Sequence, residues 1–398
     1  MAKSRLDSLI GFVHDEDPPR PVAPRRVIVL RCVWGLLVML LTAQLVAAWL
    51  PRPPQDWTSA KLDDFELRKD EYDVVFLGSS QIYRHIDPEV FDALMAEAGH
   101  ELTSFNMGVP GMAGLETRFV LKQLLAMEPA RLKWIIMDVP RTGLLLSGNN
   151  HLTPRVVNWH DVDTTLLALE LIQETEMDTA WKLDMARRHL LAFSYHLGAV
   201  GEWRHHIEPW VGGTARSRAE AEELRLVNGP GGLGEKGNGF VSMYKTFVAS
   251  SGYERGLLRE RNQKWKKVKD KLTTQLRQTP NRPRFLRRYS GERRSDPQLK
   301  PAEQDLISQL SSLPEQAGLR VAFTNAPDVR QKEFMVESAE LQGIIPVLLD
   351  VDDPVRFPQL TDPALRFDDM HLDQKGAAVY TACLAELFVE YLSQLGDG

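Results

Sequence analysis

The sequence predicts an α/β protein with a doubly wound parallel sheet, a largely helical insertion and one N-terminal transmembrane helix. Short apolar runs alternate with amphipathic helical segments over 71–146 and again over 301–398. Strands that read as continuous apolar runs are typical of a parallel sheet covered on both faces. An uncharged stretch lies ahead of them. A chain of 398 residues, 43% of them hydrophobic, is long enough to bury such a core.

The uncharged stretch covers 32–50 and extends back to Val27 across Arg31. Its length suits one bilayer crossing, so we expect a cytoplasmic tail over 1–26 and a transmembrane anchor over 27–50. Basic residues ahead of the anchor favour a cytoplasmic N-terminus, although three acidic residues dilute them. A cleaved signal peptide is the alternative, but the run is longer than the usual apolar region of one. We therefore expect a single-pass protein of the inner (cytoplasmic) membrane with a periplasmic C-terminal domain.

A proline-rich linker over 51–70 is expected to lead into the first part of the core, 71–146. This part is predicted to contain strands at 74–78, 102–108 and 132–140, with helices at 89–99 and 114–128. The second part, 301–398, is predicted to contain strands at 319–327 and 344–351, with helices at 301–318, 328–343 and 371–395.

Between the two parts, the strand and helix alternation stops over 147–300, which we interpret as a helical insertion or cap. Four tryptophans there could stack on sugars or belong to a core: Trp159, Trp181, Trp203 and Trp210. The segment 255–294 carries fifteen Lys or Arg residues. It is either a solvated helix face or a surface for anionic lipid or an anionic polymer. A net charge of −6 gives no argument for nucleic acid as a partner.

The sequence Gly78-Ser79-Ser80 directly follows the first predicted strand. In doubly wound sheets, ligands bind at the carboxyl ends of the strands, so this turn could belong to an active site. The glycine permits a tight turn, and a following helical turn would direct N–H groups at an anion or a developing oxyanion. The alternative is that these serines only cap a helix.

Asp368 and His371 lie three residues apart just before the closing helix. This spacing lets the carboxylate orient the imidazole, which could then act as a base toward a serine nucleophile. One alternative is a helix-capping aspartate beside a surface histidine. Another is a cation site made by Asp368, Asp369, His371 and Asp373, but no second cluster with metal-ligand spacing completes it. We expect no metal and no other cofactor.

After the second predicted strand, the segment 104–112 contains Asn106, Gly108 and Gly111. Glycines there would allow the backbone to approach a substrate closely and donate an N–H to an oxyanion. Together with Gly78-Ser79-Ser80 and Asp368-Asp369-Met370-His371, this segment resembles the SGNH (GDSL-like) hydrolase superfamily. The resemblance covers about 71–145 and 301–395 and implies a flavodoxin-like three-layer sandwich. It also implies a Ser80, His371 and Asp368 triad, with Ser80 and Gly111 in the oxyanion hole.

One block departs from that family. The superfamily has an Asn after the third strand, where this chain has Val139-Pro140-Arg141-Thr142. We therefore expect oxyanion donors among backbone groups of Ser80 and Gly111. Further candidates for substrate or oxyanion contacts are Asn106, Gly108, Arg141 and Thr142.

The Gly-Ser-Ser form, the missing Asn and the anchor are similar to membrane-associated acyltransferases of bacterial envelopes, such as alginate O-acetyltransferases and the teichoic acid D-alanyl transfer protein. This resemblance implies O-acylation, most simply O-acetylation, of a cell-envelope or exported polysaccharide. It also implies a multi-spanning membrane O-acyltransferase as the partner that supplies acyl groups. Two alternatives stay open: a membrane-anchored carbohydrate esterase or lipase, and a non-catalytic scaffold subunit.

Overall fold

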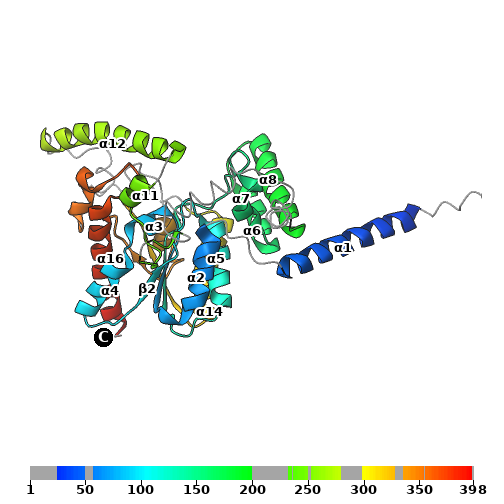
Figure 1. Ribbon diagram of the computed structural model, residues 1–398, viewed down its shortest axis with the longest axis horizontal. Coiled ribbons are helices and arrows are strands. Elements are labelled where there is room, and N and C mark those ends of the chain that lie inside the picture. Colours follow the sequence, from blue (N-terminus) through cyan, green and yellow to red (C-terminus); the bar gives the residue numbers. More distant parts are fainter. Residues whose placement is uncertain are drawn as a thin grey trace, which may run out of the picture. The chain divides into compact units, whose positions relative to one another are not determined.

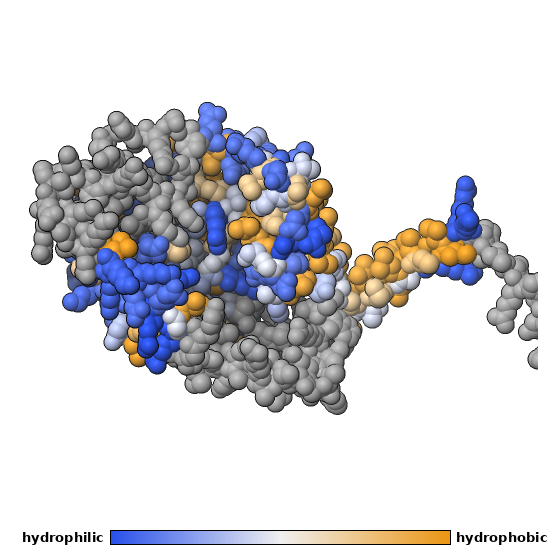
Figure 2. Space-filling view, turned by 90° about the horizontal axis from the view of Figure 1, so that it is seen from above, coloured by the Kyte–Doolittle hydropathy of each residue, from blue (hydrophilic) through white to orange (hydrophobic). Residues whose placement is uncertain are grey.

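The computed structural model describes residues 25–49, 57–199, 232–234, 236–249, 252–278, 298–327, 335–353 and 355–396. The chain divides into two compact units, Met1–Pro51 and Arg52–Gly398. In the first unit, helix α1 (Arg25–Trp49) confirms the helix expected over 27–50. Its residues Arg25–Val46 are long and apolar enough to cross a membrane. On the face shown in Figure 2, apolar side chains cover most of α1, as a bilayer-spanning helix requires.

The second unit is built on a five-stranded parallel sheet with the order β2-β1-β3-β4-β5. The strands are β1 (Val74–Leu77), β2 (Ser104–Asn106), β3 (Trp134–Met137), β4 (Arg320–Thr324) and β5 (Leu348–Leu349). The chain passes from β1 to β2 on one side and then to β3 on the other, so the winding direction reverses beside β1. In such sheets, ligands bind outside the carboxyl ends of the strands at this reversal. The predicted α/β class and parallel sheet are confirmed.

Helices cover both faces of the sheet because successive strand residues point to opposite sides. Val75 and Leu77 pack with one apolar cluster, whereas Val74 and Phe76 pack with another. The first cluster includes α2 (Trp57–Arg68), α5 (Gly114–Ala126), α14 (Pro301–Gln316) and α15 (Met335–Leu341). The second includes α3 (Ser80–His85), α4 (Pro88–Glu97) and α16 (Gln374–Leu395). Figure 1 shows α4 and α16 on one side of the strands and α2, α5 and α14 on the other.

Within the described part of 147–300 the regular elements are helical. They are α6 (Pro154–Asn158), α7 (Val162–Glu174), α8 (Thr179–Leu197), α11 (Met243–Ala249) and α12 (Gly252–Gln278), with a 3-10 turn at Asn150–Leu152. Leu167 and Leu171 of α7 join the same apolar cluster as α5 and α14, so this region packs onto the core. Trp159 is buried and Trp181 packs against that cluster, which favours the core interpretation for both. Trp203, Trp210 and residues 279–294 of the basic segment lie outside the described residues.

The linker expected over 51–70 is wrong in its second half. Residues Trp57–Arg68 form α2, whose Leu62 and Phe65 are buried in the core. The proline pattern predicted an extended spacer, but it ends at Pro54, and the residues that follow carry a helical apolar spacing. The strand expected over 344–351 is shorter in the structure: β5 has only two residues, because Pro346 has no N–H to donate to a sheet. Of the helix expected over 328–343, the described part is α15.

Candidate active site

Ser80 is the first residue of α3, directly after the turn that ends β1. Gly78 makes this turn with a φ of +151°, and a Cβ there would lie 1.8 Å from Oδ1 of Asp138. Only glycine fits such a position. Ser79 caps α3, since its Oγ accepts from the N–H of Gln81 at 3.1 Å. The expected helical turn after the two serines is therefore present, and it carries Ser80 at the carboxyl edge of the sheet.

Ser79 is held by Asp138, the residue that follows β3. Its N–H and hydroxyl donate to the two carboxylate oxygens of Asp138 at 2.6 and 2.5 Å. Both side chains are buried. Burial raises the pKa of Asp138 to about 6, although the two hydrogen bonds from Ser79 favour the ionised form. Asp138 was missed in the sequence, where its only signal is a carboxylate placed at the end of an apolar strand.

His371 and Asp368 lie in a tight loop ahead of α16. Oδ1 of Asp368 accepts from the backbone N–H groups of Met370 and His371 at 2.8 and 2.7 Å. The N–H of Phe367 donates back to the His371 carbonyl at 2.9 Å. These bonds close the loop, so both side chains are held by their own backbone. The spacing of three residues in the sequence is explained by this turn.

The structure brings Ser80, His371 and Asp368 together in a row. Nε2 of His371 lies 2.9 Å from Oγ of Ser80, and Nδ1 lies 3.0 and 3.1 Å from the two oxygens of Asp368. Asp368 and His371 are buried, whereas Ser80 is partly exposed. Burial would raise the pKa of Asp368, but hydrogen bonds from His371 and the loop backbone outweigh it and lower this pKa to about 2. The carboxylate is therefore ionised and can orient the Nδ1–H tautomer.

A second histidine, His85 at the end of α3, forms a hydrogen bond with the loop that carries Asp368 and His371. Its Nε2 accepts from the backbone N–H of Leu372 at 3.0 Å, so the ring must be neutral with its proton on Nδ1. Burial and the neighbouring His371 hold the pKa of His85 well below its usual value. The neutral ring thus fixes the peptide next to His371. The helix that carries Ser80 and the loop that carries His371 are connected by this bond.

The loop after β2, residues 107–113 and hereafter the β2 loop, has a free backbone N–H at Gly111, where the sequence predicted an oxyanion donor. Met107, Gly108 and Val109 donate to the Phe76 carbonyl, Asn106 Oδ1 and the Gly78 carbonyl at 2.7, 2.9 and 2.8 Å. Pro110 has no N–H. Within the described part of the chain, the N–H groups of Gly111 and Ser80 donate to no protein acceptor. Both are therefore open to a ligand.

Asn106 and Gly108, predicted as possible substrate contacts, have structural roles instead. The Asn106 amide donates to the carbonyls of Ile82 and Ile86 at 2.8 and 2.7 Å, and its side chain is fully buried. A Cβ on Gly108 would lie 2.4 Å from the N–H nitrogen of Tyr83. These residues fasten the β2 loop against α3. The sequence showed their location but not that their polar groups are used within the protein.

Arg141 and Thr142 run beside the β2 loop. Their carbonyls accept from the N–H groups of Gly114 and Leu115 at 2.8 and 2.9 Å. The exposed Arg141 guanidinium reaches the Gly111 carbonyl at 3.5 Å, the limit of a hydrogen bond. Arg141 is therefore close to the predicted oxyanion donor, and neither residue contacts the triad through a hydrogen bond in the described structure.

Lys61 is a buried cation that the sequence placed in a linker. Its Nζ donates to the carbonyls of Asn106, Gly108 and Gly239, each at 2.7 Å, and the residue has no exposed surface. Burial and the charge of Arg84 lower the pKa of Lys61 well below its ordinary value. Three acceptors match the three protons of an ammonium group. Lys61 thus connects α2 with the end of β2, with the β2 loop and with Gly239 of the region 147–300.

Among the described residues, no group of three or more His, Cys, Asp or Glu side chains is placed to hold a metal ion. The arrangement offers a hydroxyl, an imidazole and a carboxylate in hydrogen-bonded sequence, and the backbone N–H groups of Ser80 and Gly111 have no acceptor among the described residues. This set can perform nucleophilic acyl transfer. No protein-family model matches the chain, and no curated protein is significantly similar to it.

Proposed function

We propose that this protein is a membrane-anchored serine acyltransferase of the SGNH type that acts on an exported or cell-envelope polysaccharide. The observation that carries the proposal is the row Ser80, His371 and Asp368, with contacts of 2.9 and 3.0 Å. Serine is a weak nucleophile unless a base removes its proton, and a carboxylate behind the base stabilises the imidazolium that forms. Such a row at the carboxyl edge of a parallel sheet is typical of an active site.

The chemistry follows in two steps. Ser80 Oγ attacks the acyl carbonyl while His371 Nε2 takes its proton, and Asp368 stabilises the resulting imidazolium. The negative charge that grows on the carbonyl oxygen is stabilised by N–H donors, for which Ser80 and Gly111 are the candidates. The leaving group takes the proton from His371 and an acyl-enzyme remains. In the second step, His371 deprotonates a sugar hydroxyl, which attacks the acyl carbonyl. The bond between the acyl carbon and Ser80 Oγ then breaks, and His371 returns the proton to Ser80 Oγ.

The location of the reaction is part of the proposal. Helix α1 supports a single anchor, and the basic residues ahead of it favour a cytoplasmic N-terminus with the catalytic unit outside. Acyl thioesters made in the cytoplasm cannot reach that side unaided, so a multi-spanning membrane O-acyltransferase is the proposed source of acyl groups. A reporter fused after residue 398 should be active outside the cytoplasm only. Activity of the fusion in the cytoplasm would contradict this topology.

Labelling with a fluorophosphonate probe tests the acyl-transfer proposal. The full-length protein in detergent micelles should become labelled at Ser80, and Ser80→Ala should abolish the labelling, since the probe reacts only with an activated serine. Ser393→Ala is a matched control, because the Ser393 hydroxyl donates to the Val389 carbonyl on α16. Absent labelling would overturn the proposal in favour of a scaffold, and labelling that persists in Ser80→Ala would overturn the assignment of Ser80 as the nucleophile.

The esterase alternative shares every residue named above and differs only in the acceptor. Incubation with a chromogenic acetyl ester, with and without acidic and neutral oligosaccharides, separates the two by mass spectrometry. Acetylated oligosaccharide is the result expected of a transferase. Free acetate alone, with all oligosaccharides unmodified, would withdraw the transferase assignment in favour of hydrolysis.

A further inference from the structure

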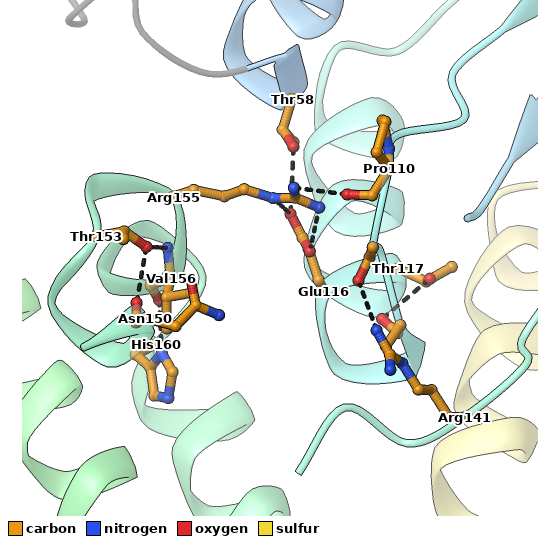
Figure 3. A network of polar contacts seen from close by, with 12 residues as sticks. Thr58, Pro110, Glu116, Thr117, Arg141, Asn150, Thr153, Arg155, Val156 and His160 are labelled. Carbon is orange, nitrogen blue, oxygen red and sulfur yellow. Dashed lines mark hydrogen bonds and ion pairs between the residues drawn. The ribbon is translucent and has the colours of Figure 1, made fainter. Parts of the chain in front are cut away.

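Arg155, at the start of α6, reaches across to the β2 loop. Its Nη1 donates to the Pro110 carbonyl at 2.8 Å. Its Nε and Nη2 donate to the two oxygens of Glu116 on α5 at 2.6 and 2.8 Å, a bidentate pair. Thr58 of α2 also donates to Glu116, at 3.2 Å. Figure 3 shows Arg155 extended between Glu116 and Pro110, with Thr58 approaching the same carboxylate.

The Pro110 carbonyl and the Gly111 N–H belong to one peptide group. No cis peptide bond occurs in the described chain, so this group is trans, and its C=O and N–H point in opposite directions. A guanidinium that holds the carbonyl therefore also sets the direction of the N–H. The hydrogen bond further polarises the peptide, which makes its N–H a stronger donor.

The Pro110–Gly111 peptide is the central peptide of a turn that the Met112 N–H closes on the Val109 carbonyl at 3.1 Å, and this closing bond does not use the central C=O and N–H. Gly111 has a φ of +77°, and a Cβ built there would find no atom within 4 Å, so no packing holds this position from the side-chain direction. The preceding N–H groups of the β2 loop are tied to the protein, and Gly111 carries the first free one. Glu116 is buried and Arg155 is about one-quarter exposed, so their ion pair is a firm anchor in comparison with a surface pair.

We propose that Arg155 is a positioning residue that, held by Glu116, aims the Gly111 N–H at the oxyanion of the acyl-transfer reaction. The inference rests on the proposed function. It gives the region 147–300 a role in the reaction, since α6 belongs to that region. Arg155 does not touch the reacting atoms; it acts through the Pro110–Gly111 peptide.

Arg155→Met removes the charge and keeps most of the side-chain length, so it tests the proposal directly. Loss of one oxyanion donor typically lowers kcat by about a hundred- to a thousand-fold, so we expect a fall of about a hundred-fold with KM changed by less than about threefold. In a Gly111→Ala background, where the donor is already displaced, Arg155→Met should lower kcat by less than about threefold, because both changes remove the same interaction.

Arg188→Met is the matched control. Arg188 on α8 also pairs with a carboxylate, Asp184, and donates to two backbone carbonyls, of Leu146 and Gly148, but it does not contact the β2 loop. The Arg188→Met variant should lose about as much stability as Arg155→Met and keep the wild-type kcat. Arg155→Lys should recover little, because one ammonium cannot make the bidentate pair and reach Pro110 together. A kcat of Arg155→Met within about threefold of wild type, or a fall no larger than in Arg188→Met, would overturn the proposal.

Hydrogen exchange measured by mass spectrometry on the full-length protein gives a readout that needs no activity. A peptide covering the β2 loop should exchange faster in Arg155→Met than in wild type or Arg188→Met. Unchanged exchange there would overturn the positioning role even if kcat fell. If the wild-type protein neither turns over nor reacts with the fluorophosphonate, the proposed function fails, and the catalytic part of this inference fails with it. Faster exchange in Arg155→Met would then show only that Arg155 stabilises the β2 loop.

Discussion

Lys61→Met should destabilise the protein far more than an ordinary lysine substitution. Each of the three carbonyls that Lys61 contacts at 2.7 Å would face a methyl group instead of a donor. Leaving a buried acceptor unsatisfied costs about 1–3 kcal/mol, and the lower value for three acceptors gives a loss of about 3 kcal/mol. The loss is not larger because the substitution also ends the cost of burying an ammonium group, a cost that lowers the pKa of Lys61.

The free energy of unfolding can be measured by urea titration of the full-length protein in detergent micelles, followed by tryptophan fluorescence. Lys122→Met is the control, since Lys122 is about one-third exposed and pairs with Asp161 and Asp163 at 3.5 and 3.1 Å. Exposed pairs contribute about 0–1 kcal/mol, so the control should stay within about 1 kcal/mol of wild type. A Lys61→Met protein as stable as the control would refute the assignment of Lys61 as the donor that satisfies these carbonyls.

Three further predictions concern the serines, the triad and two buried histidines. Ser80→Ala should abolish ester turnover while Ser79→Ala keeps part of it, and a dead Ser79→Ala with an active Ser80→Ala would move the nucleophile by one residue. His371→Ala combined with Ser80→Ala should be about as inactive as either alone, because members of one catalytic unit are non-additive; additive losses would argue against a unit. Burial lowers the pKa of His160 and His189 to about 3 and about 4, so the fold favours their neutral forms. As the pH falls below the unfolded value of about 6.5, the unfolded chain gains protons that the fold excludes. Because Nε2 of His160 and Nδ1 of His189 face each other at 2.9 Å, the pair can hold one shared proton, so exclusion of the second should cost about 2 kcal/mol of stability at pH 5. A variant with Gln at both positions should lose this part of the decline between pH 7 and pH 5 in urea titrations, and an unchanged decline would contradict the assignment.

The parts of the site that the sequence revealed are those coded by short segments. Gly78-Ser79-Ser80 follows an apolar run, and Asp368 and His371 are spaced as their turn requires. The parallel sheet could likewise be predicted, because apolar runs and helical patterns are local features. The location of the candidate site at the carboxyl ends of the strands could then be predicted, because ligands bind there in doubly wound parallel sheets.

The missing parts are those that depend on contacts between distant segments. Asp138 holds Ser79 across 59 residues, and Lys61 reaches Gly239 across 178. Neither partner changes the local pattern around the other. The prolines near residue 52 predicted a spacer. The face of α2 that carries Phe65 is buried because Phe65 packs against Phe105 of β2, a contact between distant segments that the local sequence does not indicate. The same holds for Arg155 and Glu116. Each lies near the start of a helix, and neither local sequence indicates the ion pair that the fold forms between them.

The distance along the chain between Ser80 and His371 has a consequence for when the protein can act. The nucleophile and its base are separated by 291 residues, and the base is brought to the serine by a loop that leads into α16. Strands β1, β2 and β3 are all synthesised before that loop exists. A chain that is cut ahead of residue 366 keeps Ser80 but lacks this loop, so on the proposed function its serine would be inert however well its first strands have folded. The activity that we propose therefore requires the whole second unit, and a truncated product would carry none of it.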